Sequence, residues 1–81
     1  MIEKDLARET EKWLKKAAAK RKKVRLIDKS KSEMLKNIDA YVSDTKHFAK
    51  KGDMIRAFEA IVWAWAWMEI LEELEIVKTS A

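Results

Sequence analysis

The sequence predicts an all-α fold, an up-down-up bundle of three helices that forms one domain over residues 1–81. With 81 residues, the chain has room for a single small domain. It contains one Gly and no Pro, too few for the many turns of a β-sandwich or barrel. Hydrophobic residues make up 48% of the chain, which is too many for a disordered protein. A compact helical domain is the class that remains.

The first predicted helix covers about residues 2–24. Its apolar residues are spaced so that they fall in one stripe of a helix with about 3.6 residues per turn. The stripe consists of Ile2, Leu6, Trp13 and Ala17. Lysine and arginine crowd the second half of the segment, where they complement the negative end of the helix dipole.

Residues 25–32 break this spacing and are predicted to link the first two helices. Ser30 and Glu33 have the spacing of a capping box, in which a hydroxyl and a carboxylate each bind a free backbone amide at a helix start. Ser32 is the competing cap. The second helix then runs over about residues 33–51. Its buried face is predicted to consist of Leu35, Ile38, Tyr41, Val42, Thr45, Phe48 and Ala49.

Gly52 and Asp53 predict a tight turn between the second and third helices. A glycine just after a helix adopts the left-handed conformation without the steric penalty of a Cβ. An aspartate that follows directly is a good N-cap for the next helix. Because the connection is so short, the two helices are expected to form an antiparallel hairpin.

The third predicted helix, over about residues 54–77, is unusually apolar. From residue 57 to residue 71, only Glu59 and Glu69 carry a charge. A helix that is apolar on more than one side lies at the centre of its fold or has a second partner. We therefore expect self-association, or binding of another protein, through this helix; the alternative is that all four tryptophans lie in the core. The residues expected in the interface are Ile61, Trp63, Trp65, Trp67 and Met68.

The segment YVSDTKHFAKKGDMIRAFEAIVWAWAWMEIL, residues 41–71, contains three recognisable motifs. The motif positions are Tyr41, Ser43, Asp44 and Phe48, then Lys51, Gly52 and Asp53, then Ala57, Phe58, Ile61, Ala64 and Trp67. Together with EKWLKKA at residues 11–17, they resemble the archaeal domain of unknown function 357 family. The departures from the family pattern are Trp63 for Tyr, Ala66 for Gly, Glu69 for Asp, and a linker without Pro. The resemblance implies a small up-down-up helical bundle of archaeal type and implies no known activity.

Residues 12–31 form a strongly basic segment, with ten Lys or Arg residues opposed only by Asp28. A positive stripe of this density is typical of nucleic-acid binding, which we hold as the alternative function. The candidate contact residues are Lys16, Lys20, Arg21, Lys22, Lys23 and Arg25. A second interpretation is an internal network of ion pairs, because an up-down-up bundle places this segment beside the acidic end of the third helix. The acids there are Glu69, Glu72, Glu73 and Glu75.

The sequence offers no catalytic set, so we expect a protein that is not an enzyme and has no cofactor or small-molecule substrate. The chain has no Cys and one Gly, which excludes thiolate chemistry and glycine-rich phosphate loops. His47 is the only histidine, and one His beside Asp44 cannot complete a metal site. Glu69 and Glu73 lie one turn apart and could share a cation, but a solvated acidic face is the simpler expectation.

No membrane segment is expected either. The first residues are charged where a signal peptide would be apolar. The longest uncharged run, residues 60–68, is much shorter than the roughly 20 residues that a spanning helix needs. The sequence therefore predicts a cytoplasmic protein.

Overall fold

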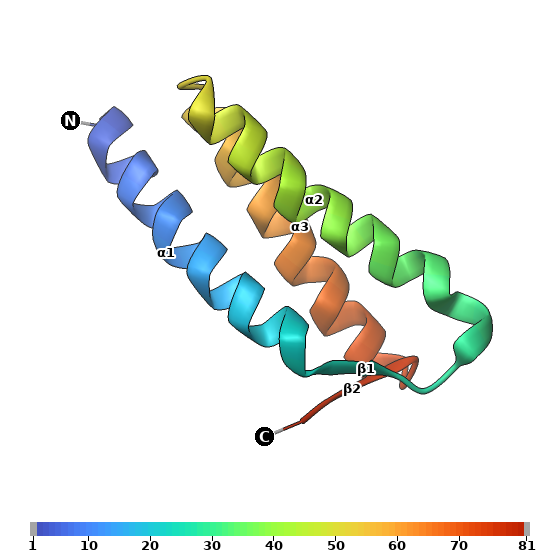
Figure 1. Cartoon of the computed structure of the whole chain (residues 1–81). Coiled ribbons are helices and arrows are strands. Elements are labelled where there is room, and N and C mark those ends of the chain that lie inside the picture. Colours follow the sequence, from blue (N-terminus) through green and yellow to red (C-terminus); the bar gives the residue numbers. More distant parts are fainter. Residues whose placement is uncertain (1, 81) are drawn as a thin grey trace.

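The computed structural model describes residues 2–80 and contains three helices, α1 (Ile2–Lys23), α2 (Ser32–Lys50) and α3 (Met54–Glu73). Helices α2 and α3 form an antiparallel hairpin and pack most closely, whereas α1 packs mainly against α3 (Figure 1). The predicted all-α, up-down-up architecture is thus confirmed. The predicted domain also included Met1 and Ala81, which lie outside the described residues.

A small antiparallel sheet closes the end of the bundle where α1 and α3 finish (Figure 1). Strand β1 (Val24–Leu26) pairs with β2 (Val77–Thr79), so that Val24 lies opposite Thr79 and Leu26 lies opposite Val77. Helix α1 therefore ends one residue before its predicted limit at about residue 24, and the predicted limit of α3 at about residue 77 is wrong, because α3 ends at Glu73. Val24 and Val77 are each only 2% exposed, and burial of these side chains in the core favours the paired strands over further helical turns.

The start of α2 also differs from the prediction. Asp28 Oδ1 accepts hydrogen bonds from Ser30 N (3.0 Å) and Ser30 Oγ (2.6 Å), and so caps a short 3₁₀ helix, η1 (Lys29–Lys31). These bonds lower the pKa of Asp28, the side-chain bond most. The predicted capping box of Ser30 and Glu33 is absent, since no side chain caps α2 among the described residues. Helix α2 begins at Ser32 and ends at Lys50, one residue earlier at each end than predicted.

The turn between α2 and α3 has the conformation that the sequence predicts. Gly52 has a φ of 81°. Its N–H donates to Ala49 O (3.0 Å), and Asp53 N donates to Phe48 O (2.9 Å), the bond pattern of a helix end with a left-handed residue. Asp53 Oδ1 then accepts from Arg56 N at 3.2 Å and caps α3.

Helix α3 ends in the same way but without a glycine. Glu75 is left-handed, with a φ of 58°. Glu75 N donates to Glu72 O (3.0 Å), and Ile76 N donates to Leu71 O (2.9 Å). The chain then turns toward the linker, where Ile76 O accepts from Ile27 N at 2.8 Å and from Asp28 N at 3.2 Å.

The core lies along the inner side of α3. Its fully buried apolar residues are Ala17, Val24, Ile38, Ala57, Ala60, Ile61, Ala64, Met68, Leu71 and Val77. Ile61 and Met68 are 0% exposed, so the prediction that they belong to an interface is wrong. They lie on the side of α3 that packs into the bundle. Within residues 2–80, none of the helices has the length and apolar character needed to cross a membrane.

Candidate functional site

The outward side of α3 carries an exposed apolar surface, which we call the α3 face. It consists of Ile55, Val62, Trp63, Ile70 and the helix-capping Leu74. At about 100° per residue these positions fall on one side of the helix. Among residues 2–80, seven large apolar side chains are exposed, and five of them belong to this face.

The three tryptophans predicted for an interface have different surroundings. Trp63 is 51% exposed and stacks on Tyr41, with ring centroids 6.4 Å apart and an interplanar angle of 20°. Trp65 is half-buried against α1: its ring meets that of Trp13 edge to face at 5.4 Å, and its Nε1 donates to Trp13 O at 3.2 Å. Trp67 is also partly buried against the core. Only Trp63 therefore presents most of a tryptophan surface outward.

Four residues of the α3 face were missed from the sequence, namely Ile55, Val62, Ile70 and Leu74. Their apolar character at helical spacing was the available signal. The tryptophans obscured this signal, because Trp63 and Trp67 lie on one side of the helix and Trp65 lies nearly opposite, so that together they mark no single face.

Charges lie at the two ends of the α3 face and not at its middle. No residue from Ala60 to Met68 is charged. Exposed Lys50, Lys51, Arg56 and Glu59 lie near the hairpin turn, where Arg56 pairs with Asp53 at 3.6 Å, and exposed Glu69 and Glu73 lie near the opposite end. The face thus has a basic end, where Lys50, Lys51 and Arg56 outnumber Asp53 and Glu59, an apolar centre and an acidic end.

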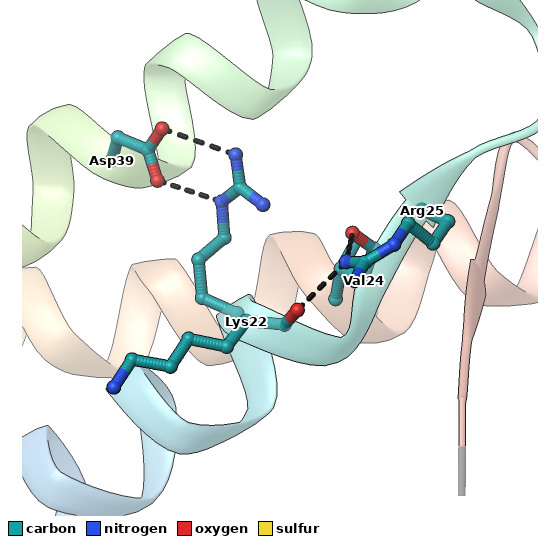
Figure 2. A network of polar contacts seen from close by, with 5 residues as sticks. Lys22, Val24, Arg25 and Asp39 are labelled. Atoms are coloured by element: carbon teal, nitrogen blue, oxygen red, sulfur yellow. Dashed lines mark hydrogen bonds and ion pairs between the residues drawn. The ribbon is translucent and has the colours of Figure 1, made fainter.

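Two of the six predicted basic contact residues are held in ion pairs. Arg21 binds Asp39 of α2 with two hydrogen bonds, Nε to Oδ1 at 2.7 Å and Nη2 to Oδ2 at 3.1 Å (Figure 2). Lys20 Nζ lies 2.7 Å from Glu72 Oε1 of α3 and 5.1 Å from the centroid of the Trp65 ring. The interpretation as an internal ion-pair network is therefore correct for these two residues.

The bond from Lys20 has a measurable electrostatic consequence. It is the largest cause of a lowered pKa for Glu72, because it stabilises the ionised carboxylate. The nearby hydroxyl of Thr79 acts in the same direction. Thr79 Oγ1 nevertheless forms no well-aligned hydrogen bond with any described residue, so we attribute the lowered pKa mainly to Lys20.

The other four basic residues form no ion pair within residues 2–80. Lys16 Nζ lies 5.2 Å from the centroid of the Trp13 ring. Arg25 turns back along the chain, where its Nη1 donates to Lys22 O (2.7 Å) and Val24 O (3.1 Å), while the Lys22 side chain extends away from Asp39 and Arg25 (Figure 2). Lys23 is exposed.

A shallow hollow of about 490 Å³ lies beside this segment, and we call it the lysine hollow. It is bordered by Lys16, Lys20 and Lys23 of α1, by Trp65 of α3 and by Ser80 after β2. The sequence could not show it, because one wall comes from Thr79 and Ser80, which lie beyond the predicted end of the third helix at about residue 77.

No catalytic or metal site emerges from the part of the chain that the structure describes. Within residues 2–80, no three His, Asp or Glu side chains are close enough to share a metal ion. His47 packs edge to face on Phe48, with ring centroids 5.5 Å apart. The chemistry available at the two surfaces is apolar contact on α3 and ionic contact at the end of α1.

The model of the family described as "Protein of unknown function (DUF357)" matches residues 7–77. The chain belongs to the DUF357 family. The crystal structure of protein AF1782 from Archaeoglobus fulgidus, also a DUF357 member, is similar: sequence identity is 40%, the TM-score is 0.90, and the match covers 99% of this chain and 100% of that one. No curated protein matches the sequence.

These findings confirm the resemblance inferred from the motifs. The DUF357 match starts in α1 and ends at Val77, the first residue of β2. It therefore includes the α3 face and most of the lysine hollow.

Proposed function

We propose that this DUF357 protein is a non-enzymatic interaction module that associates with a second copy of itself through the α3 face. One observation carries the proposal. Among residues 2–80, five large apolar side chains are exposed on the α3 face alone, whereas the buried apolar set contains only six residues larger than alanine. A patch of this kind on a small protein marks a binding surface, and small domains often gain stability by oligomerisation.

The charge arrangement favours a second copy over an unrelated partner. Two α3 helices that pair antiparallel about a two-fold axis bring the same face of each copy together. The uncharged centres, residues 60–68, then meet. Arg56 at the basic end of one copy, which pairs with Asp53 of its own chain, lies beside the acidic end of the other, where Glu69 and Glu73 project, and Glu59 adds one like charge to the same contact. One face thus supplies both halves of a complementary pair.

Sedimentation velocity tests the proposal. The wild-type protein is expected to sediment as a dimer, and Trp63→Lys is expected to shift it to monomer because a charge would be buried at the centre of the contact. Since Trp63 stacks on Tyr41, Ile70→Lys provides a second disruption without an aromatic partner.

Ile27→Lys is the matched control. Ile27 is also large, apolar and exposed, but it lies in the linker and not on α3. This variant is expected to remain dimeric. A wild-type monomer at high concentration, or a dimer that withstands both Trp63→Lys and Ile70→Lys, would reject self-association through the α3 face.

Nucleic-acid binding is a second candidate function, favoured by the charge at the end of α1. The six basic residues there face two acids in ion pairs, Asp39 and Glu72. These six residues therefore keep four positive charges that no ion pair neutralises, as many as the net charge of +4 of the whole chain. Absence of any retention on nucleic acid at about 50 mM salt would reject this function, because phosphate contacts are strongest at low salt.

A further inference from the structure

We infer that the lysine hollow is a binding site for single-stranded nucleic acid, with backbone phosphates on the lysines of α1 and a base against Trp65. The inference rests on the second candidate function and names a site and a ligand for it. It is independent of self-association, because the α3 face and the lysine hollow involve different residues.

The three lysines form a continuous row on one side of α1. Lys16, Lys20 and Lys23 are four and three residues apart, a spacing that places side chains on the same face of a helix. At a rise of about 1.5 Å per residue the row spans about 10 Å. A row of this length lets its ammonium groups contact more than one phosphate of the same strand.

The row keeps an excess of positive charge after its own partners are counted. Glu72 pairs with Lys20, but an ammonium group has three donors and can still bind a phosphate. Lys16 and Lys23 form no ion pair within residues 2–80. The C-terminal end of α1 contributes only about half a negative charge. The site thus keeps a net positive charge of more than one unit.

The wall opposite the lysines favours a single strand over a duplex. Trp65 is half-buried and borders the hollow, with Lys20 Nζ 5.1 Å from its ring centroid, so a base that packs on this ring takes the place of that ammonium group. Single-strand binding sites combine a basic groove with an aromatic surface on which a base can stack. In a duplex the bases are stacked on one another and cannot reach an aromatic side chain. Ser80 adds a hydroxyl at the rim, where its Oγ donates to Lys23 O at 3.3 Å and can still accept a hydrogen bond.

The test compares two double variants by fluorescence anisotropy with a labelled oligouridylate. Lys16→Gln with Lys23→Gln removes two cations from the hollow and leaves the Lys20–Glu72 pair intact. Lys12→Gln with Lys15→Gln is the matched control, because it removes the same charge from the same helix at residues that pair with Glu9 and Glu11 outside the hollow. Circular dichroism checks that both variants keep their helices.

The wild type is expected to bind with an affinity that falls steeply with salt. The hollow variant should bind at least about tenfold more weakly at about 50 mM salt, and the slope of log K against log[salt] should become shallower by about 1.4, or about 0.7 for each lost contact. The control variant should change far less. In an NMR titration the indole N–H signal of Trp65 should shift, while that of Trp63, on the α3 face, should not.

The contrary outcomes are distinguishable. No binding of oligouridylate at about 50 mM salt rejects both the site and the nucleic-acid function. Equal weakening by the two double variants, or an unchanged Trp65 signal, overturns the hollow as the site but leaves the function in place. Equal or tighter binding of random-sequence duplex DNA overturns the choice of a single strand. Binding to phosphatidylserine vesicles but not to oligouridylate overturns the inference in favour of a membrane surface.

Discussion

Helices α2 and α3 end in the same pattern of backbone hydrogen bonds, yet the left-handed residue is Gly52 in one and Glu75 in the other. At Gly52 the conformation is free of strain, because glycine has no Cβ. At Glu75 a side chain occupies a region that disfavours it, at a cost of about 1 kcal/mol or more. The same turn is thus relaxed at one end of the bundle and strained at the other.

Contacts far away in the sequence hold the strained turn in place. Ile76 O accepts hydrogen bonds from Ile27 N and Asp28 N, and Val77 is buried in the core beside β1. The hairpin end is therefore specified by adjacent residues, and the sheet end by residues about fifty positions apart. Substitutions at the two ends should differ accordingly.

The largest expected effect is at the sheet end. Val77→Asp should lower the free energy of unfolding by about 3 kcal/mol or more, because it buries a carboxylate in an apolar site. Urea denaturation followed by circular dichroism measures it. Lys78→Asp, on the exposed side of the same strand, is the control and should change stability little. If Val77→Asp unfolds at the same urea concentration as the wild type, pairing of β1 with β2 does not stabilise this end of the bundle.

Reciprocal changes at the two left-handed residues should have opposite signs. Gly52→Ala should lower the free energy of unfolding by about 1 kcal/mol. The added Cβ would meet no atom within 4 Å, so the loss comes from the backbone conformation alone. Glu75→Gly should raise the free energy of unfolding by about 0.5–1 kcal/mol, because it relieves the strain. Thermal unfolding of both variants gives the comparison.

Each of these variants has a control. Gly52→Asn should lower the free energy of unfolding less than Gly52→Ala does, since Asn tolerates the left-handed region better. Glu73→Gly removes the same charge within the last turn of α3 and should destabilise by about 1 kcal/mol. If Glu75→Gly also destabilises the protein, Glu75 makes a favourable contact that outweighs its strain.

The smallest expected effect concerns the ion pair between Lys20 and Glu72. Glu72→Gln should lower stability by up to about 1 kcal/mol at neutral pH, as for a partly exposed pair. Because the pKa of Glu72 is lowered in the folded state, the contribution is present above the ordinary pKa of a glutamate and is lost as the pH falls through the folded-state pKa. The two proteins should therefore converge in acid, and a difference that persists at low pH would contradict this origin.

The parts of the fold that could be predicted have their causes within a few residues. Gly52 and Asp53 define a turn by themselves, so the hairpin was clear from the sequence. Strands of three residues have no detectable period, and Glu75 gave no sign that α3 ends beside it. Both features depend on the pairing of β1 with β2, which joins residues about fifty positions apart.

The same limit applies to the candidate surfaces. Trp63 and Trp65 are two residues apart and therefore project in very different directions from α3, but the sequence does not say which side α1 covers. The hydrogen bond from Trp65 Nε1 to Trp13 O shows that α1 covers the Trp65 side. Likewise, Lys20 and Arg21 are neighbours in the sequence, yet they pair with different helices, through Glu72 of α3 and Asp39 of α2.

The pairing of β1 with β2 also sets an order for folding. Val24 and Thr79 are partners separated by more than fifty residues, so their contact requires the closure of a long loop. The turn at Gly52 closes only a very short loop, at a much smaller cost in entropy. Residues 77–79 leave the ribosome after the β1 residues with which they pair. During synthesis the α2–α3 hairpin can therefore form early, whereas β1, at the basic end of α1, can pair only after β2 has been synthesised.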